Sequence, residues 1–151
     1  MMRLCTIGYE RAAFADFAAA LVTAGVTAVI DVRAEPHSRR REFALKHLGP
    51  GLAAYGIGYE SWPALGTPAV GRAAAKRGDM ASFARIFYDQ LASDRAQAAM
   101  DALVARMTDE TPCLMCYERD PAHCHRTLIV ERLRERVDFD LRDLCVDGAV
   151  R

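Results

Sequence analysis

The chain has 151 residues, of which 52% are hydrophobic and 26% are charged, and this composition is typical of one globular domain of ordinary size. It excludes a collagen, a coiled coil and a disordered tail, whose compositions differ strongly from this average. Twenty Lys and Arg residues balance twenty Asp and Glu residues. The balance argues against the overall basic surface of a non-specific nucleic-acid-binding protein, although it allows a local basic patch.

The first ten residues contain no pattern of an export signal. The most apolar stretch, residues 17–30, is interrupted by Thr23 and Thr27 and is too short to span a bilayer. The five cysteines are an odd number, without the density of a secreted disulfide framework. We therefore expect a cytoplasmic protein that does not enter a membrane and whose cysteines are reduced thiols.

Short β-rich runs alternate with amphipathic helical windows along the first part of the chain. Residues 4–7 are predicted to form a strand that ends at Gly8. A helix follows, because apolar residues from Phe14 to Val22 fall on one face and Gly25 closes the pattern. Residues 26–32 are almost continuously apolar, which suits a parallel strand covered on both faces.

The middle of the chain is less regular. We expect a short helix at residues 42–48 and a third, weaker strand at residues 57–62. Residues 63–78 contain two prolines and three glycines, which predicts a long irregular loop, and loops of this length often act as lids over functional sites.

The last part of the chain returns to clear helical signals. Asp79 is predicted to cap one helix. Asp94 and Gln97 form a capping-box pair at the start of the next helix. Asp120, followed by Pro121, is predicted to start a helix that reaches about residue 137.

Two further strands, at residues 111–117 and 141–146, complete the predicted elements. Their alternation predicts an α/β fold, with three layers and a mainly parallel sheet flanked by helices, of the Rossmann-like or flavodoxin-like kind. No internal repeat or linker divides the sequence, so we expect one domain over residues 1–151.

Ligands of open parallel sheets bind at the carboxyl ends of the strands, where loops and helix N-termini converge. The predicted strand ends bring one group of polar and reactive residues to that edge. They are Tyr9, Asp31, Arg33, Ser38, Arg39, Glu118, Cys124, His125 and Arg126.

Cys124 is the candidate nucleophile of this group. It falls in the first turn of a predicted helix, where backbone N–H groups and the helix dipole favour a thiolate, and His125 and Arg126 add donors and positive charge. Glu118 and His125 are the candidate acid and base. The alternative is that Cys124 is a small buried hydrophobic residue and that Glu118 only pairs with an arginine.

Asp31 and Arg33 are candidate ligand-binding residues, because alternate residues of a strand share a face and arginine binds anions as a fork. An aspartate that only ties down a loop is the alternative. Residues 39–41 form the only basic run, which suits either a phosphate or nucleic-acid contact or a solvated loop. Tyr9 could stack on a base or belong to the core.

A zinc site is suggested by the spacing of Cys113 and Cys116, followed by Cys124 and His125. However, residues three apart in a strand point to opposite faces of the sheet. We therefore expect no metal ion, and nothing in the sequence calls for another cofactor.

Several short motifs resemble a known family. They are Thr6-Ile-Gly-Tyr9, Asp31-Val-Arg33 with Pro36 and Ser38-Arg39, Leu65-Gly66, Leu114-Met-Cys-Tyr-Glu118 and Cys124-His-Arg126. In this order and spacing they resemble the domain of unknown function 488 (DUF488) family, a group of small cytoplasmic bacterial and archaeal proteins. The resemblance implies an α/β fold and brings no established reaction. The segment Asp31-Val-Arg33 after a strand, with a cysteine at the end of a later strand, is also similar to sulfurtransferases of the rhodanese type.

These observations lead to three hypotheses of function. The first is an enzyme that uses Cys124 on a small polar or anionic substrate. The second is a non-catalytic module that binds a phosphate, a nucleotide or a nucleic acid at the same edge. The third is a rhodanese-like sulfur carrier. The sequence does not fix an oligomeric state.

Overall fold

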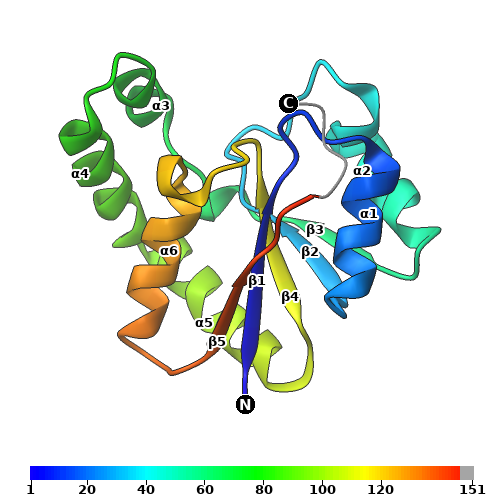
Figure 1. Ribbon diagram of the computed structural model, residues 1–151. Coiled ribbons are helices and arrows are strands. Elements are labelled where there is room, and N and C mark those ends of the chain that lie inside the picture. The colour runs from blue at the N-terminus through cyan, green and yellow to red at the C-terminus, as the bar shows by residue number, and fades with distance from the viewer. Residues whose placement is uncertain (147–151) are drawn as a thin grey trace.

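The computed structural model describes residues 1–146, and its centre is a five-stranded sheet (Figure 1). All neighbouring strands are parallel, in the order β3-β2-β4-β1-β5. The strands are β1 (Arg3–Gly8), β2 (Ala28–Asp31), β3 (Gly58–Ser61), β4 (Pro112–Cys116) and β5 (Asp140–Asp143).

Helices cover both faces of the sheet, with α1 and α2 on one side and α4, α5 and α6 on the other (Figure 1). This arrangement confirms the predicted three-layer α/β class. The layers are those of Rossmann-like and flavodoxin-like folds, while the strand order differs from both. The helices are α1 (Phe14–Thr23), η1 (Arg41–Phe43), α2 (Leu45–Ala53), η2 (Pro63–Leu65), α3 (Ala69–Lys76), α4 (Met80–Leu91), α5 (Asp94–Asp109), η3 (Pro121–His123) and α6 (His125–Arg134).

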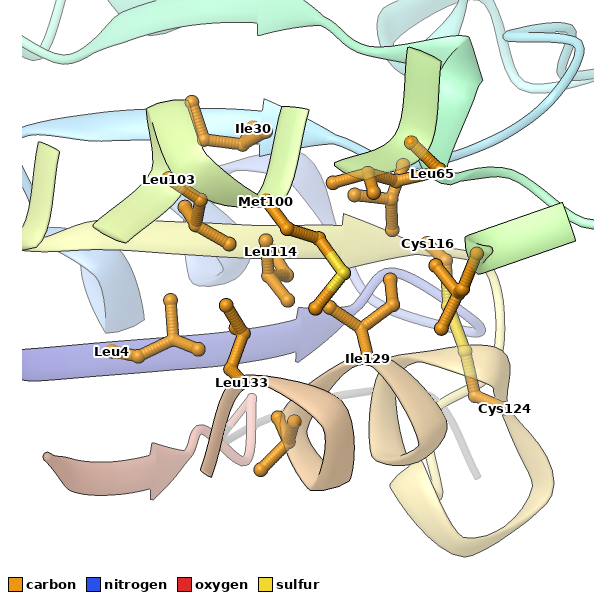
Figure 2. Close-up of a cluster of buried hydrophobic side chains, with 14 of the residues drawn as sticks. Leu4, Ile30, Leu65, Met100, Leu103, Leu114, Cys116, Cys124, Ile129 and Leu133 are labelled. Atoms are coloured by element: carbon orange, nitrogen blue, oxygen red, sulfur yellow. A yellow bond between two sulfur atoms is a disulfide. The ribbon is translucent and has the colours of Figure 1, made fainter. Parts of the chain in front are cut away.

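Strand β4 lies near the middle of the sheet and contributes to the core on both faces. Leu114 and Cys116 pack into the cluster beneath α4, α5 and α6 (Figure 2). Cys113 and Met115 pack into the cluster beneath α1 and α2. The prediction that Cys113 and Cys116 face opposite sides of the sheet is therefore confirmed. Among residues 1–146, no helix has both the length and the apolar character needed to cross a membrane.

The prediction of an irregular loop at residues 63–78 is wrong, because this segment forms η2 and the two-turn helix α3. Gly71 lies inside α3 for a packing reason. A Cβ at this position would lie 2.7 Å from Thr67 Cγ2 and 3.2 Å from Ile86 Cγ2, so glycine lets α3 approach α4 closely. Gly78 adopts a φ of 79° after the helix, which is the conformation typical of a helix end.

The start of α5 also differs from the prediction. Asp94 is the first residue of the helix, and Ser93 is its N-cap, since the Ser93 hydroxyl oxygen accepts a hydrogen bond from the backbone N–H of Ala96. Gln97 does not complete a capping box, because its side-chain amide donates to the carbonyl oxygen of Leu91.

Three other boundaries are corrected. The helix expected at residues 42–48 is divided into η1 and the longer α2, which continues past Pro50 to Ala53. Asp120 caps only the short helix η3, and α6 begins at His125 and ends at Arg134. Strand β5 covers residues 140–143 instead of 141–146.

Candidate functional site

A cavity of about 930 Å³ lies at the carboxyl end of the sheet, a volume suited to a small-molecule ligand. Its floor is formed by the chain just after β4 and by the first residues of α6. One wall is the segment after β2, residues 33–40, and the other is formed by α3 and the start of α4. The two walls are far apart in the sequence and both carry basic side chains.

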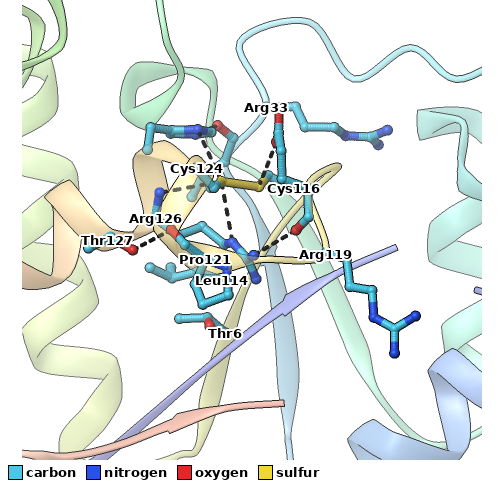
Figure 3. The surroundings of a disulfide bond; sticks show 12 residues. Thr6, Arg33, Leu114, Cys116, Arg119, Pro121, Cys124, Arg126 and Thr127 are labelled. Carbon is cyan, nitrogen blue, oxygen red and sulfur yellow. Dashed lines mark hydrogen bonds between the residues drawn. A yellow bond between two sulfur atoms is a disulfide. The ribbon is translucent and has the colours of Figure 1, made fainter. Parts of the chain in front are cut away.

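Cys116 and Cys124 meet at the floor of the cavity, where their sulfur atoms are joined in a disulfide (Figure 3). Cys116 is the last residue of β4, and Cys124 directly precedes α6. The expectation of reduced thiols is therefore wrong for this pair, while Cys5, Cys113 and Cys145 are free. The pair depends on how the loop of residues 117–123 returns to the sheet, which the spacing of cysteines does not reveal.

Hydrogen-bond donors surround the sulfur of Cys124. Cys124 is the N-cap of α6, and its Sγ accepts from the backbone N–H of Arg126 at 3.5 Å and from Arg126 Nε at 3.3 Å. Arg126 is only 1% exposed, and its Nη2 donates to the carbonyl oxygen of Glu118 at 2.6 Å (Figure 3). Burial lowers the pKa of Arg126, but a guanidinium stays protonated in proteins. In the reduced protein these donors favour a thiolate at Cys124.

His125 is buried beside Cys124 and is neutral at neutral pH. Its pKa is lowered to about 4, chiefly because burial disfavours the imidazolium, and the positive charge of Arg126 lowers it further. Its Nε2 lies 2.7 Å from the carbonyl oxygen of Val32, which can only accept, so Nε2 carries the proton. The unprotonated Nδ1 then lies 3.6 Å from Cys124 Sγ. The positive charge next to the sulfur thus comes from Arg126 and not from His125.

The sulfur of Cys116 has the opposite surroundings. It lies 3.6 Å from Oε2 of Glu118. A nearby carboxylate disfavours a thiolate, so in the reduced protein Cys116 is expected to remain a thiol. In the reduced protein we therefore expect a thiolate at Cys124 and a thiol at Cys116, although the two sulfurs are neighbours.

Gly8 at the end of β1 allows the chain after β4 to lie close to the sheet. A Cβ at this position would lie 1.7 Å from the carbonyl oxygen of Glu118, so no larger residue fits this backbone path. Hydrogen bonds from the backbone N–H of Tyr9 to Cys116 O (3.2 Å) and from Glu10 to Tyr117 O (2.9 Å) continue the pairing beyond the strands. This close approach places Cys116 and Glu118 at the floor of the cavity.

Arg33 holds one wall of the cavity in place. Its Nε and Nη2 donate to the fully buried Asp31, with 2.7 Å from Nη2 to Oδ2. Its other hydrogen bonds go to the hydroxyl oxygen of Tyr9 and to the carbonyl oxygens of His37 and Phe43. Burial alone would lower its pKa, but the bonds and charge of Asp31 raise it. All five N–H groups of Arg33 are engaged, which leaves none for a ligand.

Other cations of the cavity are less constrained. Arg72 donates to Thr67 O at 2.9 Å and lies 3.4 Å from Glu35. Within the described part of the chain, the exposed side chains of Arg39 and Lys76 make no hydrogen bond or ion pair with the protein. Arg39 belongs to the wall after β2 and Lys76 to α3. An anion in the cavity would thus find free donors on both walls.

Most residues predicted for the site line this cavity. They are Tyr9, Arg33, Ser38, Arg39, Glu118, Cys124 and His125. Asp31 and Arg126 lie behind the lining, where they bond to Arg33 and Cys124. The sequence does not predict Cys116 as the partner of Cys124, and it does not predict Arg72 and Lys76 because it favours a loop where the structure has α3. The helical spacing of four residues between these two cations was the signal that could have found them.

One group among residues 1–146 has the composition of a metal site. The sulfurs of Cys116 and Cys124 and a ring nitrogen of His125 all lie within 4.8 Å of one another. Metal ions bind cysteine as the thiolate, and the disulfide leaves no thiolate at either position.

The comparison with protein families gives one result. A family model described as "Domain of unknown function DUF488" matches residues 13–133. Neither the comparison with curated proteins nor the comparison with solved structures gave a match. The matched range includes both walls of the cavity, the cysteine pair and Arg126. The chain therefore belongs to the DUF488 family.

Proposed function

We propose that the protein is an enzyme that uses the thiolate of Cys124 as a nucleophile on a small anionic substrate held in the cavity. The observation that carries this proposal is the buried guanidinium of Arg126, whose Nε points at the Cys124 sulfur from 3.3 Å. A buried cation is costly without an opposite charge close to it. Asp143, Glu118 and Asp120 already favour the cation from a distance, and the reduced Cys124 adds a charge in direct contact with it as a thiolate.

The substrate class follows from the lining of the cavity. Arg39 and Lys76 offer unengaged cations from two different segments of the lining, and Arg72, which is bonded to Thr67 and Glu35, adds further positive charge. Met80 and Phe83 give the same space an apolar side. This combination suits an organic acid or phosphate with a short carbon chain.

The test is the rate of iodoacetamide alkylation of each cysteine in the reduced, native protein, mapped by mass spectrometry over a range of pH. We expect Cys124 to be modified with a midpoint clearly below the ordinary value of about 8.5. Because a cation within a few ångströms favours the thiolate, Arg126→Met should raise this midpoint by about one unit or more, whereas Arg126→Lys should restore part of the difference.

The exposed Cys145 serves as the internal control, since neither Arg126 variant should change its rate. Circular dichroism of both variants checks that the fold is intact. Inertness of Cys124 until the protein unfolds would assign it to packing and contradict the proposal.

The cationic walls also favour a second candidate, a non-catalytic module that binds phosphate or a nucleotide. Binding would then weaken with salt and with Arg39→Gln, and it would be unchanged in Cys124→Ser. Isothermal titration of the Cys124→Ser protein with inorganic phosphate and with a nucleotide distinguishes the two candidates when it is combined with the alkylation result.

A further inference from the structure

We propose that Cys116 is the resolving thiol of a two-cysteine cycle, and that the substrate is a small disulfide that carries carboxylates. The inference rests on the proposed function, because Cys124 is the residue that attacks first. It adds a second cysteine, a role for Glu118 and a substrate class.

The unequal surroundings of the two sulfurs set the order of attack. Cys124 faces the N–H groups of Arg126, which stabilise a thiolate before substrate arrives. Cys116 faces the carboxylate of Glu118 at 3.6 Å, so it remains a thiol until its proton has an acceptor. Glu118 is placed to be that acceptor. Cys124 therefore attacks the substrate first, and Cys116 reacts only after it has lost its proton.

The oxidation of the protein takes two thiol–disulfide exchange steps. First, the Cys124 thiolate attacks one sulfur of the substrate disulfide; a Cys124–substrate disulfide forms, and the other half leaves as a thiolate that takes a proton from solvent. Then Cys116 gives its proton to Glu118 and attacks the sulfur of Cys124, which releases the second half as a thiolate. The protein has lost two electrons and carries the Cys116–Cys124 disulfide, while the substrate has become two thiols. An external dithiol must reduce the protein again.

The position of the disulfide suits a catalytic rather than a structural bond. Both of its cysteines line the cavity and are otherwise buried, at 1% and 4% exposed, so a substrate has to approach the sulfurs from the cavity. Helix α6 does not depend on the bond for its attachment, since Ile129 and Leu133 (Figure 2), together with Val130, already anchor it in the core. The pair also belongs to two different elements, β4 and the start of α6, so opening the bond breaks neither element.

The charges of the cavity define the ends of the substrate. Arg39 and Lys76 belong to different segments that line the cavity together with the sulfur pair. A disulfide with one carboxylate at each end suits such a lining, because its central sulfurs need to reach the cysteines while its ends need cations. Its methylene groups fit the apolar side formed by Met80 and Phe83.

The experiment begins with the fully reduced protein, freed of reductant and mixed with 2,2'-dithiodiglycolate. We expect the wild type to release two thiols per chain and to end with Cys116 joined to Cys124, as mapped by mass spectrometry. Cys116→Ser should release one thiol and retain a stable mixed disulfide at Cys124. Cys124→Ser should release none beyond the slow exchange of the exposed free Cys145. Cys145→Ser removes that exchange and should still release two thiols per chain and form the Cys116–Cys124 disulfide.

Two further disulfides of similar length test the substrate class: the neutral bis(2-hydroxyethyl) disulfide and the cationic cystamine. We expect the dicarboxylate to react about tenfold faster than the neutral compound, with cystamine slowest. Exposed ion pairs are weak, so Arg39→Gln and Lys76→Gln should each reduce the rate by about fivefold or less, and high salt should act in the same direction. Both residues are exposed, and their substitution leaves the core unchanged.

The outcomes separate the two proposals. Accumulation of the mixed disulfide in the wild type would show that Cys116 does not resolve it, while Cys124 would remain a nucleophile. An unmodified Cys124 in Cys116→Ser would overturn both proposals. Equal rates for the three compounds would remove the carboxylate requirement.

A zinc ion retained by the reduced wild type and lost from both single cysteine variants would make the pair metal ligands and overturn the cycle. The product analysis of the wild type is decisive even if one variant does not fold.

Discussion

Buried polar side chains beside the cavity differ in charge because they differ in partners. Arg126 remains a cation next to a sulfur, whereas His125 is held neutral by burial. Asp31 and Arg33 form a fully bonded pair, and the hydroxyl of Tyr59 donates to Asp31 at 2.6 Å. Residue type alone predicted positive charge at both His125 and Arg126. Burial and the positive charge of Arg126 lower the pKa of His125, although its hydrogen bond to Val32 opposes this shift. Arg126 keeps its proton because the pKa of a guanidinium is far higher to begin with.

The neutral His125 makes stability depend on pH. In the unfolded chain the imidazole binds a proton below its ordinary pKa of 6.5, whereas the folded protein binds it only near pH 4. Acid therefore favours the unfolded state, and the contribution of His125 is lost as the pH falls from 6.5 towards 4. We expect the free energy of unfolding to decrease by about 2 kcal/mol between pH 7 and pH 5 from this residue.

Urea unfolding at both pH values measures the effect, with the oxidation state of the cysteines held constant. The variant His125→Gln keeps a polar, uncharged side chain and should remove most of the pH dependence in this range. The variant His37→Gln is the matched control, because His37 is exposed. An equal loss of stability in wild type and His125→Gln would contradict the assignment.

At the scale of the element, α5 shows how one residue sets a helix boundary. The hydroxyl of Ser93 satisfies the N–H of Ala96, and Asp94 already belongs to the helix. We expect Ser93→Ala to lower the free energy of unfolding by about 1 kcal/mol. Asp94→Ala should cost less, about 0.5 kcal/mol, because it removes only a favourable charge near the helix dipole. Thermal unfolding of both variants checks this order, and the reverse order would restore Asp94 as the cap.

The success of prediction also differs from element to element. Helices with a continuous apolar stripe, such as α1 and α4, were found from periodicity, and so were strands β1, β2 and β4 with their runs of buried residues. Helix α3 was missed because its sequence is rich in alanine, contains Gly71 and lies between Pro68 and Gly78. Helix α3 is stabilised by close packing on α4, and this contact cannot be predicted from the local sequence.

At the scale of the whole molecule, the cavity is assembled from segments that only the fold brings together. Parallel strands place their carboxyl ends on one edge, and this rule correctly placed Tyr9, Cys124 and His125 on one lining. It could not pair Cys116 with Cys124, because that contact depends on the close approach of the chain to Gly8. It also could not find the second wall, which requires α3 as a helix.

An anion that bridges the two walls should stabilise the folded protein. At a concentration ten times its Kd, a bound ligand adds about 1.4 kcal/mol to the free energy of unfolding, which is a few degrees in Tm. We expect inorganic phosphate to raise the Tm of the oxidised protein relative to sodium chloride of equal ionic strength. Lys76→Gln should reduce this shift, whereas Lys46→Gln, at an exposed position that does not line the cavity, should not. Equal Tm values in phosphate and chloride would contradict anion binding.

Some cations of the cavity hold its walls in place and others are free to bind a ligand, and this difference is useful for redesign. Arg33 is committed to Asp31 and to the backbone of its own wall, and Arg72 joins the two walls through Thr67 and Glu35, so the frame of the cavity does not depend on Arg39 or Lys76. Those two positions can be exchanged for neutral or acidic residues while the cysteines and Arg126 stay in place. A small library at these positions would therefore be a direct route to variants that accept neutral or cationic compounds with the same sulfur chemistry.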